Sequence, residues 1–317
     1  MGAYLVRRLF FAVVVVVLVS MGTFALLHAA PGGPGVLLSP DLTVEQREAV
    51  RANLGLDEPI YVQYGLWVSN LAQGDLGFSF VGGAPVRELI TDRLPATLLL
   101  AFAALIVATV GGLVAGVLSA TKPNSPRDHL LTAGAFIGVS IPPFWLGIVL
   151  IMIFAVQLQV LPASGMHGDG EGGVIDLLRH LVMPAVVLGL ISTATIAQYT
   201  RSAMVSVLKE HYIRTARSQG HGPRTVLFRH ALRNALLPVV TVLGTTTAAL
   251  IGGAPVTETV FGWPGMGQLA VQSARLSDYP TVMGITIVIS IIVVLVNLIV
   301  DILYQLIDPR VRLAGRS

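Results

Sequence analysis

Six long apolar stretches alternate with polar segments along the chain. Each is long enough to cross about 30 Å of hydrocarbon as an α-helix. The predicted spans are Leu9–Ala29, Ala96–Ala120, Leu131–Val156, Leu181–Arg201, Leu236–Val256 and Val282–Leu303. The pattern therefore predicts an all-α, polytopic membrane protein with about six transmembrane helices.

The first apolar stretch has two interpretations. Arg7 and Arg8 precede it, as basic residues precede the apolar core of a secretory signal peptide. The apolar run from Phe10 to Leu27 is long for such a core, and Pro31 stands where cleavage is awkward. We therefore interpret the stretch as an uncleaved first span.

The segment 31–95, between the first two spans, is long enough to have structure of its own. Thr43 and Gln46 are spaced as a capping box and predict a short helix that ends at Gly55. A second helix is predicted from Pro59, because proline is favoured in a first helical turn. One face of it would carry an apolar stripe made of Ile60, Tyr64, Trp67 and Leu71. The stripe fits a helix lying at the membrane interface, and it also fits a docking platform for an external partner.

The polar segment 202–235 contains another predicted helix. Residues His211–Gly220 are good helix formers, and Gly220 suits the left-handed position that ends a helix. A Gly-Pro pair then breaks the chain before residues 224–235, which can form a helix leading into the fifth span. A short, nearly free helix suits insertion into a partner's groove, with Ala216 facing that groove. It equally suits a solvated connector held to anionic lipid by its arginines.

The amino-acid composition is that of a membrane protein, and it excludes every kind of site that needs cysteine. The 317 residues are 54% hydrophobic and only 12% charged, against about 25% charged in soluble domains. The excess of apolar surface must face lipid, because a soluble fold has too little interior to hide it. Cysteine is absent, which excludes disulfides, thiolate metal sites and cysteine nucleophiles.

The distribution of charge predicts the orientation of the chain. With the N-terminus in the cytoplasm, the inner segments hold 14 of the 20 basic residues and the outer segments hold 13 of the 17 acidic ones. Basic residues accumulate in cytoplasmic loops. Both termini and the segment 202–235 are therefore predicted to be cytoplasmic, and the segment 31–95 extracytoplasmic. The net charge of +3 is then a topology signal and does not indicate binding to nucleic acid.

Eight short motifs, in this order, carry a resemblance to a known family. They are LGLDEPIYVQY (54–64), GDLGFS (74–79), RLPAT (93–97), SIPPFW (140–145), LPASG (161–165), YIRTAR (212–217), ETVFGWPG (258–265) and DPR (308–310). With them the chain resembles, almost end to end, the B-type permease subunits of bacterial ATP-binding-cassette (ABC) importers for dipeptides, oligopeptides and nickel. The resemblance implies one permease domain over residues 1–317 with the type I ABC importer permease fold, and an extracytoplasmic insert at 31–95.

The resemblance also implies partners. A permease of this family pairs with a second, similar permease, two ATP-binding subunits and an external solute-binding protein in the bacterial inner membrane. ATP and Mg²⁺ are bound by the ATP-binding subunits, so this chain is expected to hold no cofactor and to have no catalytic residue. The external protein does most of the selecting of the solute. A peptide is the leading expectation, and nickel and glutathione are the alternatives.

In such importers a coupling helix in the cytoplasmic segment docks on an ATPase subunit. By resemblance this role falls on nine consecutive residues: Tyr212, Ile213, Arg214, Thr215, Ala216, Arg217, Ser218, Gln219 and Gly220. The general importer pattern has Glu-Ala-Ala, three residues and then glycine, whereas this chain has Arg214-Thr215-Ala216 before Gly220. The acidic residue is therefore missing, which is normal for the peptide and nickel branch.

Two other classes of protein fit the sequence less well. A self-powered secondary carrier relies on ionisable residues at mid-membrane depth, and Asp301, near the inner end of the last predicted span, comes closest. An intramembrane protease would need a base beside Ser140, and no histidine lies well inside a predicted span. Neither Lys122 nor Lys209 lies in a phosphate-binding loop motif. Energy must then come from a partner, as the resemblance implies.

A translocation path through such spans would be lined by neutral polar groups. The candidates lie in the third, fourth and fifth spans: Ser140, Pro142, Pro143, Thr193, Thr195, Gln198, Thr245, Thr246 and Thr247. The prolines are predicted to break the third span, and the carbonyl groups that they free either line a watery path or belong to a packed kink. A path of neutral dipoles would bind solute weakly and release it readily. The seven histidines show no ligand spacing, so no metal site is predicted.

Overall fold

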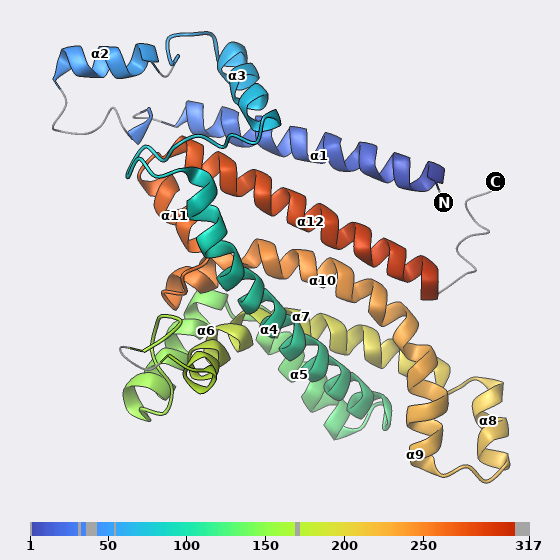
Figure 1. The fold of residues 1–317 in the computed structure, drawn as a ribbon. Helices are drawn as coiled ribbons and strands as arrows, with labels where there is room; N and C mark the ends of the chain where they lie inside the picture. The colour runs from blue at the N-terminus through green and yellow to red at the C-terminus, as the bar shows by residue number, and fades with distance from the viewer. Residues whose placement is uncertain (1, 31–32, 36–42, 54, 169–171, 308–317) are drawn as a thin grey trace. The chain divides into compact units, whose positions relative to one another are not determined.

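The computed structural model describes residues 2–30, 33–35, 43–53, 55–168 and 172–307 (Figure 1). This part of the chain is helical and has one isolated β-bridge, between Phe78 and Pro85. It divides into two units, which are described separately below. The first unit consists of Met1–Thr97 and Pro264–Val294, and the second consists of Leu98–Trp263 and Leu295–Ser317. The predicted all-α fold class is confirmed.

Within the described residues, five helices are long and apolar enough to cross a membrane, and the number rises to six if a bent pair counts as one span. The five are α1 (Gly2–Ala29), α4 (Val86–Ala120), α7 (Val174–Val207), α10 (Arg233–Val260) and α12 (Tyr279–Ile307). Each extends beyond the apolar stretch in the sequence, because helical hydrogen bonding continues into the polar turns. α4, for example, begins at Val86, inside the predicted insert and well before Ala96. About six spans were predicted, in agreement with this count.

The predicted third span is broken. α5 (Pro126–Ser140) ends just before the two prolines, and α6 (Pro143–Leu150) begins at the second of them. The angle between the two helices is 102°. A bend of this size ends one helix and starts another, because proline lacks the N–H that a continuous helix needs. α6 continues directly into a π-helical segment, η2 (Ile151–Gln157).

In the part of the first unit that the structure describes, three short helices accompany the long ones. α2 (Val44–Asn53) and α3 (Ile60–Ala72) are the two helices predicted between the first two spans, and Gly55 follows α2 with a φ of +63°. α11 (Met266–Arg275) was not predicted: it is amphipathic, but its ten residues are too few to form an apolar stretch of spanning length.

Part of the aromatic stripe of α3 packs on α1. The hydroxyl groups of Tyr64 and Ser20 lie 2.8 Å apart, and the Tyr64 ring lies 5.3 Å from the ring of Phe24. His28 Nε2 lies 3.1 Å from Gln63 Oε1. Part of the stripe is therefore covered by α1. Neither interpretation from the sequence, an interfacial helix or a docking platform for an external partner, included this packing.

A buried carboxylate connects two segments of the first unit. Asp278, 2% exposed, precedes α12 and accepts a hydrogen bond from Ser79 Oγ at 2.5 Å and one from the Phe80 amide at 2.9 Å. Thr281 Oγ1 donates to the same carboxylate at 2.7 Å. Asp278 thus ties the loop before α4 to the first turn of α12.

Close packing between α4 and α7 organises the second unit. A Cβ atom added at Gly112 would lie 2.6 Å from the Cβ of Ile196, and one added at Gly116 would lie 2.5 Å from the Cβ of Thr200. Small residues let two helices in a membrane protein approach closely, and van der Waals contact then holds them together. α10 also packs along α7, with Val239 and Val242 in one apolar cluster with Ile196.

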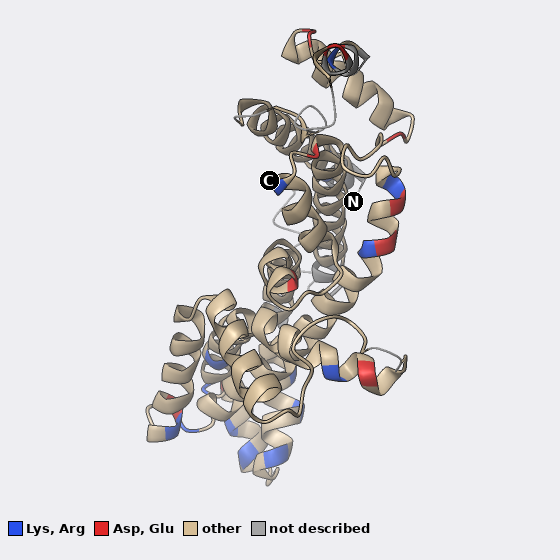
Figure 2. Ribbon diagram, turned by 90° about the vertical axis from the view of Figure 1, so that its left-hand side faces the viewer, with Lys and Arg blue, Asp and Glu red and all other residues tan. Residues whose placement is uncertain are grey.

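The polar segment before the fifth span forms a helical hairpin. Its first arm is α8 (His211–Ser218), and its second arm is α9 (Pro223–Thr225) followed by a π-helical segment, η3 (Val226–Leu232). η3 runs directly into α10, as predicted for residues 224–235. Lys and Arg gather at the end of the second unit that carries this hairpin (Figure 2).

Candidate functional site

The backbone of Gly220 ends α8. The amide of His221 donates to the carbonyl of Ala216 at 3.2 Å, and the amide of Gly220 donates to the carbonyl of Arg217 at 3.0 Å. These two bonds form a Schellman motif, which requires a left-handed residue. Gly220 has a φ of +83°, as the sequence predicts, and no other atom would lie within 4 Å of an added Cβ. Its conformation, not the space around it, therefore favours glycine.

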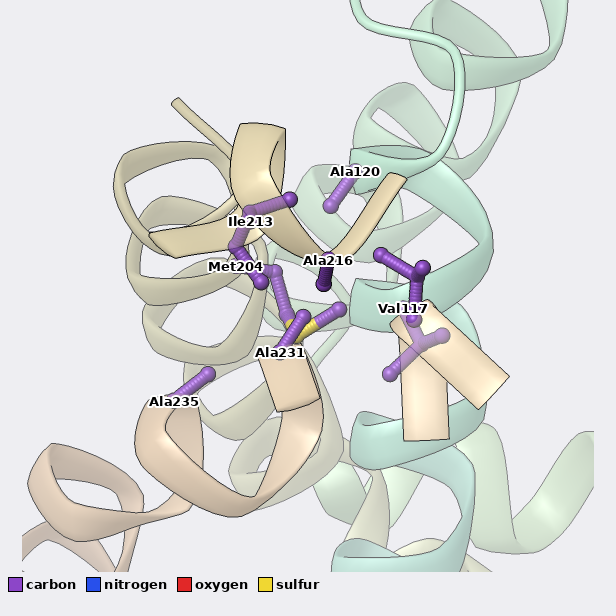
Figure 3. Close-up of a cluster of buried hydrophobic side chains, with 8 residues drawn as sticks. Val117, Ala120, Met204, Ile213, Ala216, Ala231 and Ala235 are labelled. Atoms are coloured by element: carbon purple, nitrogen blue, oxygen red, sulfur yellow. The ribbon is translucent and has the colours of Figure 1, made fainter. Parts of the chain in front are cut away.

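One face of α8 is buried in the second unit. Ile213 and Ala216 are 0% and 5% exposed and point into a hydrophobic cluster (Figure 3). This cluster, called the hairpin core below, consists of Val117, Ala120, Met204, Ile213, Ala216, Val226, Ala231 and Ala235. It joins α8 to α4, α7, η3 and α10. α8 is therefore seated on the chain's own helices and is not a free projection.

The expectation that Ala216 faces a partner's groove is wrong. Ile213 and Ala216 are the aliphatic residues of α8, and residues three apart share one face of a helix. The hydrophobic effect turns this face toward the hairpin core. Any contact with a partner must therefore be made by the other residues of α8.

The opposite face of α8 is exposed and basic. Its exposed residues are His211, Tyr212, Arg214, Thr215, Arg217 and Ser218. Three arginines on the second arm and the start of α10 are exposed as well: Arg224, Arg229 and Arg233. A surface of this kind complements an acidic protein surface or anionic lipid headgroups.

Polar contacts fix how α8 sits on the hairpin core. Asn234 Nδ2 donates to Tyr212 Oη at 2.8 Å and to the carbonyl of His230 at 3.2 Å. The rings of His230 and His221 lie 5.3 Å apart. The exposed face of α8 therefore has a defined orientation relative to α10.

An ion pair between a buried aspartate and a partly exposed arginine lies beside the hairpin core. Asp128, in the first turn of α5 and 2% exposed, accepts hydrogen bonds from Arg201 Nε at 2.7 Å and Arg201 Nη2 at 2.6 Å. Ser119 Oγ, on α4, donates to Asp128 and accepts from Arg201 Nε at 3.1 Å. The amide of Asn124 donates to Asp128 Oδ2 at 2.8 Å. Bidentate pairing and these further bonds compensate the buried carboxylate.

Sequence reasoning missed this pair. Asp128 and Arg201 are 73 positions apart, and no motif links them. The available signal was their placement: an acidic residue just before the third predicted span, and a basic residue at the end of the fourth. Only packing of α5 against α7 shows that the two residues meet.

A cavity of about 260 Å³ lies next to the ion pair, among α4, α5 and α7. Its walls include Asp128 and Arg201, the apolar residues Leu131 and Phe136, and Gln198. Gln198 is the one member of the predicted translocation path that lines this cavity.

The other predicted path residues do not line this cavity. Pro142 and Pro143 form the break between α5 and α6. Five other path candidates each donate a hydroxyl hydrogen bond to a backbone carbonyl of their own helix: Ser140, Thr193, Thr195, Thr245 and Thr247. Thr246 is only 6% exposed. Their role in a path stays a prediction.

Two family models match the chain. One, described as "Binding-protein-dependent transport system inner membrane component", matches residues 112–313. The other, described as "Binding-prot-dependent transport system membrane comp, N-term", matches residues 1–101. The chain belongs to the family of binding-protein-dependent transport system inner membrane components. The permease, as it is called below, is therefore a multi-pass inner membrane protein.

Several curated relatives match the permease over nearly its full length. It is 44% identical to the "Oligopeptide transport system permease protein AppB" of Bacillus subtilis (strain 168), over 98% of this chain and 99% of that protein. It is 41% identical to the "Di/tripeptide transport system permease protein DppB" of Pseudomonas aeruginosa (strain UCBPP-PA14), with 98% and 99% covered. The "Dipeptide transport system permease protein DppB" of Escherichia coli (strain K12) is 39% identical, with 98% of each chain covered. All three relatives are named as permease proteins of transport systems.

A solved structure supports the fold. The permease matches a chain of the inward-facing MetNI methionine ABC transporter with a TM-score of 0.58 and 21% identity, over 70% of this chain and 97% of that one. At this identity the likeness concerns the fold alone. The predicted type I ABC importer permease fold is confirmed.

Proposed function

We propose that the permease is the membrane-spanning subunit of an ATP-driven peptide importer, and that α8 is its docking element for an ATPase subunit. The peptide assignment is supported by three relatives, 39% to 44% identical, that are named as peptide permeases. The docking role is supported by one observation above all. α8 is anchored through Ile213 and Ala216 while its opposite face, with Arg214 and Arg217, is exposed.

This geometry suits the transfer of force. A helix that was held only by its two ends would yield when a partner pulled on it. α8 is instead joined to α4, α7 and α10 through the hairpin core, so a displacement of α8 moves the ends of three long helices. Closure of two ATPase subunits would draw the coupling helices together and reorient the bundle, and solute would then be released inward by alternating access.

The rest of the machine is supplied by partners. We propose a second, similar permease, two ATP-binding subunits that hold ATP and Mg²⁺, and an external solute-binding protein that selects the peptide. Both termini and α8 lie in the cytoplasm in this arrangement, as the charge distribution indicates. The path would be lined by neutral groups such as Gln198, so the permease alone should bind peptide only weakly.

Reconstitution tests this function. Proteoliposomes holding the permease, the second permease and the ATPase subunits should take up radiolabelled peptide only when ATP and the solute-binding protein are supplied. Uptake driven by a proton or sodium gradient without ATP would identify a secondary carrier. Uptake of nickel or glutathione in place of peptide would overturn the substrate assignment and leave the transporter class intact.

Cross-linking tests the docking role. Because the native chain lacks cysteine, Ser218→Cys places one thiol on the exposed face of α8. A short bismaleimide should cross-link this thiol to cysteines introduced on the surface of the ATPase subunit. Ser69→Cys, exposed on α3, is the matched control and should not be captured. Failure of every Ser218→Cys cross-link in an active complex would show that α8 is not the docking element.

A further inference from the structure

We propose that Asp128, Arg201 and Ser119, called the polar link below, transmit the movement of α8 to α5; this inference rests on the proposed docking role of α8. The polar link and the hairpin core share one turn of α4. Val117 and Ala120 enter the hairpin core, and Ser119 between them enters the polar link.

On α7, as on α4, neighbouring residues enter the hairpin core and the polar link. Met204 is 0% exposed in the hairpin core, and Arg201, one turn earlier, holds Asp128 through Nε and Nη2. A planar guanidinium that binds a carboxylate in this bidentate way sets both the distance and the angle between them. A displacement of α8 that moves this turn of α7 must therefore move Asp128 as well.

Asp128 passes the movement to α5. The backbone amide of Asp128 donates a hydrogen bond to the hydroxyl of Ser125, the residue that caps α5, at 3.3 Å. The Asp128 carboxylate accepts a hydrogen bond from the amide of Asn124. One buried side chain thus connects α4, α7 and the start of α5. α5 ends at the 102° break before α6, and such a break lets one half of the pair tilt without the other.

The polar link forms part of the wall of the cavity described above. The cavity of about 260 Å³ among α4, α5 and α7 borders Asp128 and Arg201 directly. An ion pair of this kind, with a buried Asp128 and a partly exposed Arg201, is a weak source of stability, which makes a role in positioning α5 the better reason for it.

The ratio of peptide transported to ATP hydrolysed tests the proposal. Asp128→Asn removes the charge at nearly constant volume, and Arg201→Lys keeps a charge but loses bidentate pairing. In the reconstituted complex, both should hydrolyse ATP while the transport ratio falls about tenfold. Arg127→Gln, a neighbouring exposed position, is the control and should keep the parent ratio. A purely structural role would lower both rates together and leave the ratio unchanged, which would overturn the proposal.

A distance measurement tests it without disturbing the polar link. Spin labels on Ala133→Cys of α5 and Ser218→Cys of α8, both exposed, report the spacing of the two helices. In the complex with an intact polar link, this distance should be the same without nucleotide and with ATP, because α5 follows α8. A distance that changes with ATP would overturn the proposal. ATP-driven uptake by the parent complex is measured beside it, so a failure of this inference is separable from a failure of the proposed function.

Discussion

Ala216 of α8 and Met204 of α7 lie in the same hydrophobic cluster, with 5% and 0% of their surface exposed. α8 is therefore part of the folded interior of the permease on one face and a free surface on the other. Substitutions on the two faces should have different effects: inward ones should weaken the fold, and outward ones should weaken docking.

Ala216→Asp should destabilise the permease itself. A carboxylate at this position would be buried in the hairpin core without a partner, at a cost of roughly 2 kcal/mol or more. The melting temperature of the purified permease should fall, and the amides of α8 should exchange faster with solvent.

Thr215→Asp, one position earlier and exposed, is the control for Ala216→Asp. It should keep the parent melting temperature and reduce binding of the ATPase subunits. Equal melting temperatures for the parent and Ala216→Asp would contradict the burial of this face.

Gly220→Ala should loosen the end of α8. A side chain at a left-handed residue costs about 1 kcal/mol, and Gly220 has a φ of +83°. Gly222→Ala is a matched control, because Gly222 has a φ of −63° and equally open surroundings. Hydrogen exchange of α8 should be faster in Gly220→Ala only. Similar exchange in both variants would mean that the Schellman motif does not hold this helix end.

Gly116→Ala should weaken the packing of α4 on α7. The added Cβ would lie 2.5 Å from the Cβ of Thr200 and 2.7 Å from the backbone oxygen of Ala197, so the helices must separate. We expect a loss of about 1–3 kcal/mol, typical of overpacking, in a denaturation assay in detergent. Gly134→Ala on α5 has open space around it and should be neutral or slightly stabilising. A neutral Gly116→Ala would show that the two helices are further apart.

Single cysteines should report the orientation of the chain. Ser69→Cys on α3 should react with a membrane-impermeant maleimide added to spheroplasts, and Ser218→Cys on α8 should react only after the membrane is opened. Both side chains are exposed, so protection must come from the membrane and not from the fold. Labelling of Ser218→Cys in sealed cells would reverse the proposed topology. Asp169, another candidate position for an outer label, lies outside the described residues.

Gln198 and Thr246 should respond differently to a bulky residue. Gln198 is exposed and lines the cavity beside Arg201, so Gln198→Trp should slow peptide uptake while the melting temperature stays near that of the parent. Thr246 is 6% exposed, so Thr246→Trp should overpack the interior and cost about 1–3 kcal/mol of stability. An effect of Thr246→Trp on uptake would then not identify a path residue. Unimpaired uptake by Gln198→Trp would remove Gln198 from the predicted path.

The sequence by itself predicted most of the helices, although the long ones begin or end beyond the predicted stretches and α11 was not predicted. Apolar stretches of spanning length predicted the long helices, since a backbone in lipid must satisfy its hydrogen bonds internally. Local chemistry predicted the rest: Gly220 has the left-handed conformation expected of it, and Pro142 and Pro143 break the third span. These features depend on residues close together in the chain. The motifs from residue 54 to residue 310 were likewise sufficient to identify the family.

Only the tertiary structure decided which faces meet. The sequence of α8 shows an aliphatic pair, Ile213 and Ala216, but a pattern cannot say whether that pair is covered by a partner or by the chain's own helices. Asp128 and Arg201 show the same limit, because their pairing needs α5 and α7 to pack side by side. Hydrophobic burial is non-directional, and it is the three-dimensional packing of helices far apart in the sequence that selects its partners.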